Sequence, residues 1–383
     1  MDKRKHIQHK ILSLVFVLFL LTAIIWHLVT PDSDFSETEK RPLETFTLPE
    51  IKNLVSGRFM TSFERYADDQ FPLRPFFVGL KSASEKVIGK FDNGRVWFGN
   101  DGYLIEKKTT PPDLSTHANH LFEFGVKLNK QSPETKRYLM IAPTASSMIP
   151  DVLPPFTPAI DQEAILADFY RRAGDYHVID LKDALSTDEA HRFFYRNDHH
   201  WTTEGAKVAY ENFCFAAGLE PVQDLQTSEI SDRFLGTTYA KAALFSPRPD
   251  TISIYRPAEG DDPNEKVRII DDKGSLLRTG IYAWEQLESA DPYLVFMGEN
   301  AGYLKLQTSA DTGRSLLLIK DSYANAVIPF LTHHYETIHV IDLRYFTGDL
   351  MTLMKDERPI QDTLILYNFV TFSEDKNLYR LLR

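Results

Sequence analysis

The chain has little cysteine and no excess of positive charge. Cys214 is the single cysteine among 383 residues, which excludes an intrachain disulfide framework and a zinc site built on cysteine ligands. Because Cys214 falls on the apolar stripe of a predicted helix, we expect it to be buried. Lysine and arginine total 43 against 54 acidic residues, a formal net charge of −11. This balance argues against a nucleic-acid-binding surface. Internal repeats and low-complexity tracts are also missing.

One long apolar run lies near the N-terminus, over residues 11–29, and His27 is its only ionisable side chain. At about 1.5 Å per residue it would span roughly 28 Å, close to the hydrocarbon thickness of a bilayer. Basic residues precede the run and acidic residues follow it, which predicts that residues 1–10 remain in the cytoplasm. A cleaved signal peptide is the alternative, although no small-x-small site ends the run. We expect a single-pass anchor over residues 11–30 in the cell membrane, with the rest of the chain extracytoplasmic.

Residues 31–92 are predicted to form a juxtamembrane linker and a helical arm. The linker is polar and acidic. Phe59, Phe63 and Tyr66 then recur at helical spacing, which predicts an amphipathic helix ending near Asp69. We expect the arm to pack on the domain that follows it, and contact with a membrane partner is the alternative.

From residue 93 to residue 383, strand-like and helix-like segments alternate. Residues 94–106 predict a β-hairpin around an Asn-Asp-Gly turn. The alternation favours one α/β domain, a mostly parallel sheet flanked by helices on both faces. The less regular residues 220–290 predict an inserted loop or small β subdomain, where substrate-selecting surface often lies. Buried strands are predicted at 138–142, 178–181, 316–319, 339–341 and 363–367.

The most informative motif is Asp198-His199-His200-Trp201, directly ahead of a predicted helix. It supplies a carboxylate and an imidazole within three residues. About 120 positions later, Ser322 follows the strand-like run 316–319. An Asp, a His and a Ser at such junctions are the parts of a nucleophilic acyl-transfer site. Only one of the two histidines can face the serine, and the spacing does not tell which.

Each part of this motif also has a simpler interpretation. Asp198, His199 and His200 could bind a metal, but adjacent histidines rarely chelate one ion and no H-x-x-x-H pattern reinforces them. The histidines could merely hydrogen-bond within a polar loop. Ser322 could be a helix N-cap, which is a common role for serine. Nothing in the sequence requires a metal or an organic cofactor.

If the sheet is parallel, two further strands end at the same edge of the sheet as the strand before Ser322. Ligands in open α/β sheets bind beyond the carboxyl ends of the strands, so residues at these two ends are candidates for the site. Asn368 ends the run 363–367, and Arg344 follows the run 339–341. Asn368 could donate its amide to an oxyanion while Arg344 lines the pocket, or both could serve turns. Backbone N–H groups after the serine are further oxyanion donors. The candidate substrate-binding or oxyanion residues are Asn368, Arg344, Trp201 and Tyr323.

At these residues the chain resembles the DHHW family, which is named for the tetrapeptide at 198–201. It is also similar to the alginate O-acetyltransferase-type branch of the SGNH hydrolase superfamily. The resemblance is carried by DDQFPLR (68–74), WFGNDGYLI (97–105), YRNDHHWTTEGA (195–206) and LLLIKDSYANAVIPFL (316–331). In the related acetyltransferases, the Asp and His of an Asp-x-His-Trp motif pair with a later Ser. The resemblance therefore implies Asp198, His200 and Ser322 as the catalytic triad.

The resemblance also implies a fold. Ordinary SGNH enzymes begin with the serine segment, whereas here it follows the Asp/His segment, which implies a circularly permuted, three-layer SGNH-like domain. Asn368 then lies in the block that supplies the oxyanion asparagine. The chain departs from the pattern in two places. Lys320-Asp321-Ser322 replaces Gly-Asp-Ser, and the glycine of the second block has no clear equivalent.

The activity implied is that of a membrane-anchored O-acetyltransferase, which modifies a cell-surface or secreted polysaccharide through an acyl-serine intermediate. Acetyl-CoA is not available outside the cytoplasm, so the resemblance implies a multispanning membrane-bound O-acyltransferase partner as the acyl donor. Two alternatives stay open: a carbohydrate O-acetyl esterase with the same triad, and a non-catalytic polysaccharide-binding or assembly protein. The intact Asp, His and Ser favour a catalytic role.

Overall fold

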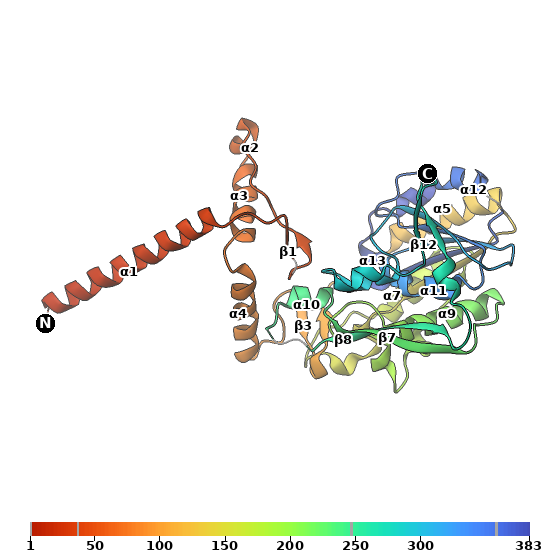
Figure 1. Ribbon diagram of the computed structural model, residues 1–383, viewed down its shortest axis with the longest axis horizontal. Helices are drawn as coiled ribbons and strands as arrows, with labels where there is room; N and C mark the ends of the chain where they lie inside the picture. The colour runs from red at the N-terminus through yellow and green to blue at the C-terminus, as the bar shows by residue number, and fades with distance from the viewer. Residues whose placement is uncertain (1, 37, 246–247, 357–358) are drawn as a thin grey trace. The chain divides into compact units, whose positions relative to one another are not determined.

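The computed structural model describes residues 2–36, 38–245, 248–356 and 359–383. These residues form two compact units (Figure 1). The first contains the chain up to Gly89 together with Ala243–Phe245, and the second contains Lys90–Ala242 and the rest of the chain. The finer division expected from the sequence, into tail, anchor, arm and catalytic domain, stays a prediction.

The first unit begins with the long helix α1, Asp2–Val29. Among the described residues, the segment His6–Val29 of this helix is the one that is long and apolar enough to cross a membrane. A retained anchor and a signal sequence near an N-terminus share these properties. The expected apolar helix is therefore confirmed, whereas its retention in the membrane stays a prediction.

The rest of the first unit is a short strand ladder and three helices. The amphipathic helix predicted from the aromatic spacing is confirmed, and it ends at Asp69. Gly57, between α2 and α3, has a φ of 74°, a left-handed conformation that glycine adopts without a steric cost. Arg41 ties the ladder to the end of α3 through bonds of 2.9 and 2.5 Å to the Asp69 carboxylate. The elements are β1 (Phe35–Ser36), β2 (Arg41–Pro42), α2 (Ile51–Val55), α3 (Arg58–Asp69) and α4 (Arg74–Val87).

The second unit is built on a mixed, mostly parallel sheet, which has eight strands in the part of the chain that the structure describes. Their order is β10-β9-β11-β13-β12-β14-β5-β6. The last five strands pair in parallel, whereas β11, β9 and β10 pair antiparallel at one edge. The expected α/β class is confirmed. The strands are β5 (Lys136–Ala142), β6 (His177–Val178), β9 (Arg268–Ile270), β10 (Leu276–Thr279), β11 (Tyr303–Gln307), β12 (Ser315–Lys320), β13 (Thr337–Ile341) and β14 (Asp362–Asn368).

Both faces of this sheet are buried, which explains why its central strands are apolar throughout rather than alternating. In β12, Leu316 and Leu318 enter one core while Leu317 and Ile319 enter the other. Helix α9 (Thr203–Ala217) packs into the first core, and α5 (Ser115–Gln131), α7 (Gln162–Arg172) and α12 (Leu350–Asp356) pack into the second. Cys214 of α9 is fully buried, as predicted.

The remaining elements of the second unit are short. The predicted hairpin is confirmed as β3 (Val96–Phe98) and β4 (Leu104–Glu106), which pair antiparallel. Residues 220–290 contribute the ladder of β7 (Leu225–Phe234) with β8 (Asp250–Pro257) and two edge strands of the main sheet, β9 and β10. The short α-helices are α6 (Ala145–Met148), α8 (Lys182–Leu185), α10 (Thr237–Ala242), α11 (Ile328–Leu331) and α13 (Phe369–Glu374). The 3₁₀ helices are Asn100–Gly102, Pro150–Val152, Ala190–Phe193, Pro263–Lys266, Trp284–Glu288, Pro292–Phe296, Ser322–Ala326 and Leu378–Leu382.

Candidate active site

The carboxyl ends of the parallel strands bring the predicted site segments to one edge of the sheet. β12 ends at Lys320, β14 ends at Asn368, and Asn368 is level with Ala142 at the end of β5. Ser322 follows β12 directly and starts the 3₁₀ helix Ser322–Ala326. The convergence expected from a parallel sheet is therefore present, at the position where open α/β sheets bind ligands.

The motif at 198–201 is held by the start of α9 and by the serine turn. Thr202 caps α9, since its hydroxyl accepts from the Gly205 N–H at 3.3 Å. Trp201 is fully buried and its indole N–H donates to the Tyr323 carbonyl at 2.9 Å. This bond joins the two motifs across 122 positions of sequence. The imidazole of His200 is thereby fixed beside the serine.

Asp198, His200 and Ser322 form a continuous hydrogen-bonded relay. The His200 Nδ1 lies 2.5 Å from Asp198 Oδ1, and its Nε2 lies 2.7 Å from the Ser322 hydroxyl. A carboxylate can only accept, so Nδ1 carries the proton and Nε2 offers its lone pair to the serine. This is the tautomer that a general base for a serine nucleophile requires. Asp198 and His200 are buried, and Ser322 is half-buried.

The Asp198 carboxylate is surrounded by donors. Its Oδ1 accepts from the His200 backbone N–H at 2.9 Å, and its Oδ2 accepts from the Thr237 N–H at 2.6 Å and the Thr237 hydroxyl at 3.0 Å. Burial alone would raise the pKa of Asp198, but the neighbouring imidazoles and these donors lower it well below its usual value. The carboxylate is therefore ionised over the whole working range of pH.

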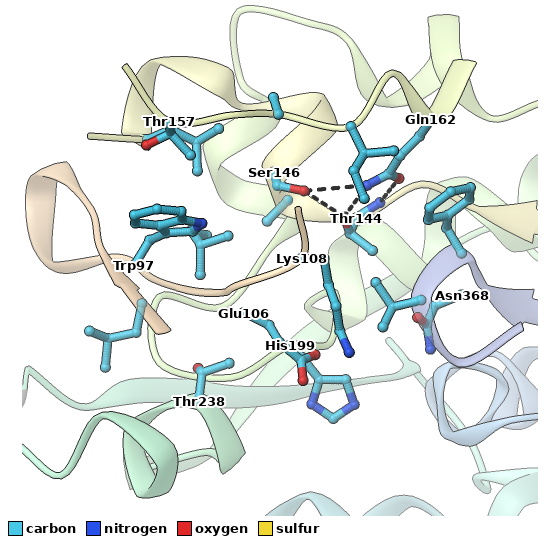
Figure 2. A pocket seen from close by; sticks show the side chains of 18 of the residues that line it. Trp97, Glu106, Lys108, Thr144, Ser146, Thr157, Gln162, His199, Thr238 and Asn368 are labelled. Carbon is cyan, nitrogen blue, oxygen red and sulfur yellow. Dashed lines mark hydrogen bonds between the residues drawn. The ribbon is translucent and has the colours of Figure 1, made fainter. Parts of the chain in front are cut away.

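His199 points away from the serine. Its Nδ1 lies 2.7 Å from the Thr237 hydroxyl, and since that hydroxyl donates to Asp198, Nδ1 must be the protonated nitrogen. Burial and the adjacent His200 lower the pKa of His199 to about 3, so the ring is neutral. The side chain is 25% exposed, and the ring lines a cavity (Figure 2). The structure thus separates the two histidines that the spacing left equivalent.

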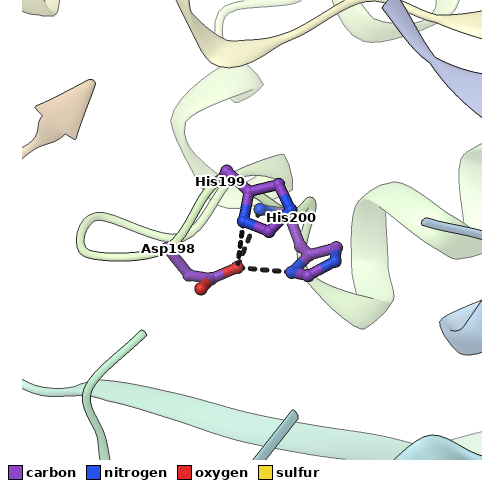
Figure 3. A group of neighbouring side chains, drawn as sticks. All are labelled: Asp198, His199 and His200. Atoms are coloured by element: carbon purple, nitrogen blue, oxygen red, sulfur yellow. Dashed lines mark hydrogen bonds and ion pairs between the residues drawn. The ribbon is translucent and has the colours of Figure 1, made fainter. Parts of the chain in front are cut away.

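Asp198, His199 and His200 also form a group that could hold a metal ion, with one ligand atom each within 4.8 Å of the others (Figure 3). In this arrangement Asp198 Oδ1 is already bonded to His200, and Nδ1 of His199 to Thr237. Both ring nitrogens of His200 are engaged, so a metal bound to this ring would have to displace its bond to Asp198 or its bond to Ser322. The geometry therefore fits a proton relay better than a coordination sphere.

The four residues predicted for substrate or oxyanion binding have other contacts here. The Asn368 amide donates to Asp321 Oδ2 at 2.5 Å and to the Thr371 hydroxyl at 2.6 Å. Arg344 forms a bidentate pair with Asp342 at 2.9 and 2.6 Å, and it lines a second cavity. Trp201 and Tyr323 are fully buried, so their side chains pack behind the site rather than facing a substrate. The physical reason is that both aromatic rings belong to the core beneath the serine turn.

Asp321 stabilises the turn that carries Ser322. It accepts from the Tyr323 N–H at 2.9 Å and from the Asn368 N–H at 2.8 Å. Burial raises the pKa of Asp321 to about 6. Because the N–H of Tyr323 is engaged here, it is not directed at an oxyanion. The N–H of Ser322 itself begins a helix, where the first N–H groups have no intrahelical acceptor.

Sequence reasoning missed two side chains that fix the relay. The ring of Tyr293 stacks on His200, with centroids 3.7 Å apart and planes 10° apart, and its hydroxyl donates to the Ser322 carbonyl at 3.5 Å. Thr237 supports Asp198 and His199 together. Both residues lie far from the motifs in sequence and carry no local pattern. The local signal beside Tyr293 is the Asp-Pro dipeptide at 291–292, which is typical of a turn and does not indicate a site.

Two cavities adjoin the relay. The first has a mixed lining, with Trp97 and Leu104 among its apolar residues and Ser146 and Gln162 among its polar ones (Figure 2). The second shares Glu106, His199, Asn368 and Val370 with the first. Glu106 is paired with Lys241 at 2.9 Å. Ser322 is not among the residues that line either of these two cavities.

Residues 133–341 match the family described as DHHW protein, which is more than half of the chain. The chain therefore belongs to the DHHW family, as its tetrapeptide predicted. It is 22% identical to the probable alginate O-acetylase AlgJ of Pseudomonas putida over 354 residues, which cover 85% of this chain and 91% of that protein. It is 25% identical to the AlgJ of Pseudomonas fluorescens over 166 residues, which cover 41% of this chain and only 42% of that relative.

Solved structures share the fold. A DHHW family protein from Eubacterium siraeum superposes with a TM-score of 0.63 at 23% identity, covering 75% of this chain and 98% of that one. Bacillus cereus PatB1, determined with a sulfonyl adduct, superposes with a TM-score of 0.59 at 17% identity, covering 74% and 98%. At these identities the likeness establishes the fold and leaves the chemistry to be argued from the site.

Proposed function

We propose that this protein is an O-acetyltransferase that acts outside the cytoplasm on a polysaccharide, through an acyl intermediate on Ser322. The observation that carries the proposal is the relay from Asp198 through His200 to Ser322, with distances of 2.5 and 2.7 Å. The distant relatives described as probable alginate O-acetylases support the transfer of acetyl groups to a polysaccharide. A circularly permuted SGNH-like arrangement remains part of the proposal.

In the first half-reaction, Ser322 Oγ attacks the carbonyl carbon of the acyl donor while His200 Nε2 takes the hydroxyl proton. The bond from that carbon to the donor's leaving oxygen or sulfur breaks, and His200 returns the proton to the leaving group. Asp198 remains ionised and stabilises the imidazolium that forms between the two events.

In the second half-reaction, a sugar hydroxyl enters in place of the leaving group. His200 Nε2 removes its proton as its oxygen attacks the acyl-serine, and the proton then passes to Ser322 Oγ when the ester bond to the serine breaks. Water entering instead would give hydrolysis. The mixed aromatic and polar lining of the cavity beside His199 suits a sugar, whose faces are apolar and whose edges carry hydroxyls.

The oxyanion needs donors close to Ser322. The Ser322 N–H is the candidate at the helix start. Asn368 is the second candidate, and its amide would have to leave the Thr371 hydroxyl, since its other bond holds Asp321. Arg344 remains a proposed pocket residue at the second cavity.

The proposed membrane topology and the proposed partner protein both depend on the source of the acyl group. Helix α1 would act as a retained single-pass anchor in the cell membrane, with a cytoplasmic N-terminus. A multispanning membrane-bound O-acyltransferase would deliver the acyl group across the membrane. Neither a metal nor an organic cofactor enters the proposed steps.

The test is intact-mass analysis of the purified full chain after incubation with an activated acetyl ester. We expect a gain of one acetyl group, lost in Ser322→Ala and slowed in His200→Ala. A sulfonyl fluoride should label the wild type at the same residue. An absence of both adducts in a folded protein would overturn the proposal in favour of a binding or assembly role. An adduct that forms but turns over equally fast with and without sugar acceptors would instead indicate an esterase.

A further inference from the structure

We propose that helix α3 lies on the lipid surface of the membrane that α1 crosses, with its aromatic face in the boundary between headgroups and acyl chains. This inference concerns the first unit and depends on α1 being retained as an anchor. It does not depend on the chemistry of the site in the second unit.

Helix α3 is amphipathic, and its apolar and charged residues lie on separate faces. At 100° per residue, Phe59, Met60, Phe63, Tyr66 and Ala67 fall within an arc of about 120°, and the charged residues fall outside it. All twelve residues of α3 are described and none is buried. Met60 is 53% exposed and Phe63 is 40% exposed. An amphipathic helix with low overall hydrophobicity and an uncovered aromatic face is typical of helices that lie in a membrane interface.

Contacts place α3 at the outer end of the apolar helix. Tyr66 packs edge-on against His27 in the last turn of α1, with ring centroids 5.9 Å apart, and its hydroxyl donates to Asp32 at 3.1 Å. Gln70 is bonded to the backbone of Ser33 at 3.0 and 2.9 Å. If α1 spans the bilayer, Tyr66 therefore lies at the depth of His27. That is the interfacial level at which tyrosine and tryptophan are enriched, and Trp26 lies beside it in sequence.

The polar side of the arm is already occupied within the unit. Asp69 bonds Arg41, and Glu39 pairs with Arg41 at 2.7 Å and Arg74 at 2.8 Å. These pairs fix α3 by its polar side. On its aromatic side Tyr66 packs against His27 and Phe46, whereas Met60 and Phe63 remain exposed. In helix α4, Phe76 packs against Phe245 at 5.8 Å between ring centroids, yet Phe76, Phe77 and Leu80 remain about half-exposed. Helix α3 is distinguished from α4 by its direct contacts with the end of α1.

Lipid is favoured over a protein partner by the direct attachment of α3 to the end of α1. Within the first unit, the helices α2, α3 and α4 run across the end of α1 rather than continuing its axis (Figure 1). A helix held transverse to a membrane-spanning helix at its outer end meets lipid headgroups before any other molecule. No residue of α3 lines the cavities beside His199, His117 and Gln131.

The test uses the chain's cysteine content. Cys214 is buried, so the unmodified full chain serves as the control for background labelling. Phe63→Cys places a probe on the aromatic face, and Arg65→Cys places one on the opposite face two residues away. Each full-length variant is labelled with an environment-sensitive fluorophore and reconstituted in phosphatidylcholine–phosphatidylglycerol vesicles. The vesicles contain no other protein. A second set of vesicles carries a phospholipid with a nitroxide quencher.

We expect a blue-shifted emission at position 63 and several-fold stronger quenching by the nitroxide lipid than at position 65. Equal quenching at the two positions would overturn the proposal. A blue shift at position 63 without lipid quenching would also overturn it, because the face would then be covered by the chain's own second unit. If the probe at position 63 is exposed to water in the lipid vesicles and shielded from water only in native membranes, the face binds a protein partner instead. Acylation of Ser322 is measured separately, so failure here leaves the proposed function standing.

Discussion

Replacing Gly236 by alanine should disable the site without removing any of its functional side chains. A Cβ at this position would lie 2.2 Å from Asp198 Cβ and 2.3 Å from Asp198 Oδ2. Ordinary carbon–carbon contacts are about 3.5–4.0 Å, so the Asp198 side chain or its backbone must move by more than about 1 Å. Because Asp198 orients His200, that movement lengthens the relay to Ser322.

The expected losses of acylation rate and of stability in Gly236→Ala are estimated from two effects. A misplacement of about 1 Å in a catalytic group can cost on the order of 100-fold in rate. Overpacking in a well-packed region costs about 1–3 kcal/mol of stability. We therefore expect Gly236→Ala to remain folded at 25 °C and to lower the rate of Ser322 acylation by roughly 100-fold, measured by time-resolved intact mass with an activated acetyl ester.

A matched control is available in helix α5. A Cβ on Gly125 would meet Tyr176 at 3.4–3.6 Å, which is ordinary contact, and alanine gains up to about 1 kcal/mol of helix propensity over glycine. Gly125→Ala should therefore acylate at the wild-type rate. The reasoning is refuted if folded Gly236→Ala acylates as fast as Gly125→Ala, since the close approach would then have no effect on the relay.

Three further changes test separate parts of the site. Asp198→Asn replaces one accepting carboxylate oxygen by an NH₂ group, which would face the N–H and O–H donors around this side chain. The change favours the wrong tautomer of His200, so the rate of Ser322 acylation should fall by about 10⁴-fold, as in other serine relays. His199 has a folded pKa of about 3, so it resists a proton that the unfolded chain accepts below about pH 6.5. The free energy of unfolding therefore decreases as the pH falls from about 6.5 toward the folded pKa of about 3. In urea unfolding, His199→Asn should reduce this decrease between pH 7 and 5 by at most about 2 kcal/mol. Tyr293→Phe keeps the ring stack on His200 and should acylate nearly normally, whereas Tyr293→Ala should be markedly slower.

Each of these has an outcome that counts against it. An Asp198→Asn rate within tenfold of wild type would mean that the carboxylate does not set the tautomer. Equal losses of stability for wild type and His199→Asn would mean that His199 takes a proton in the folded state. If Tyr293→Phe were as slow as Tyr293→Ala, the hydroxyl bond to the Ser322 carbonyl, rather than the ring stack, would be the important contact.

Much of the fold is readable from local patterns. The spacing of Phe59, Phe63 and Tyr66 predicts helix α3, and the threonines after Trp201 predict the start of α9, because capping and periodicity act over a few residues. The run 316–319 predicts β12 by its apolar continuity. The antiparallel edge made by β9, β10 and β11 was not predicted, because short edge strands have weak patterns and owe their pairing to a neighbour distant in sequence.

The candidate site divides in the same way. Asp198, His200 and Ser322 could be named from the sequence, because the residue types and their place at element ends indicate the chemistry. The pattern without the family resemblance left His199 and His200 equivalent. Two features of the site depend on packing between strands that lie far apart in the chain. One is the burial of Trp201 and Tyr323, and the other is the hydrogen bond from Asn368 to Asp321. No local signal reports such contacts.

By itself the sequence determined the apolar helix, the α/β class, the family and the residue types of the relay, since each depends on composition or on spacing within a few turns. The family resemblance implied that His200 meets Ser322, and the tertiary structure shows the contact between them. Only the tertiary structure decided that Tyr293 and Thr237 support the relay and that Asn368 is bonded to Asp321. The physical reason is that hydrogen-bond direction and ring stacking are set by the relative placement of distant backbone segments. The sequence encodes that placement only through the packing of the whole core.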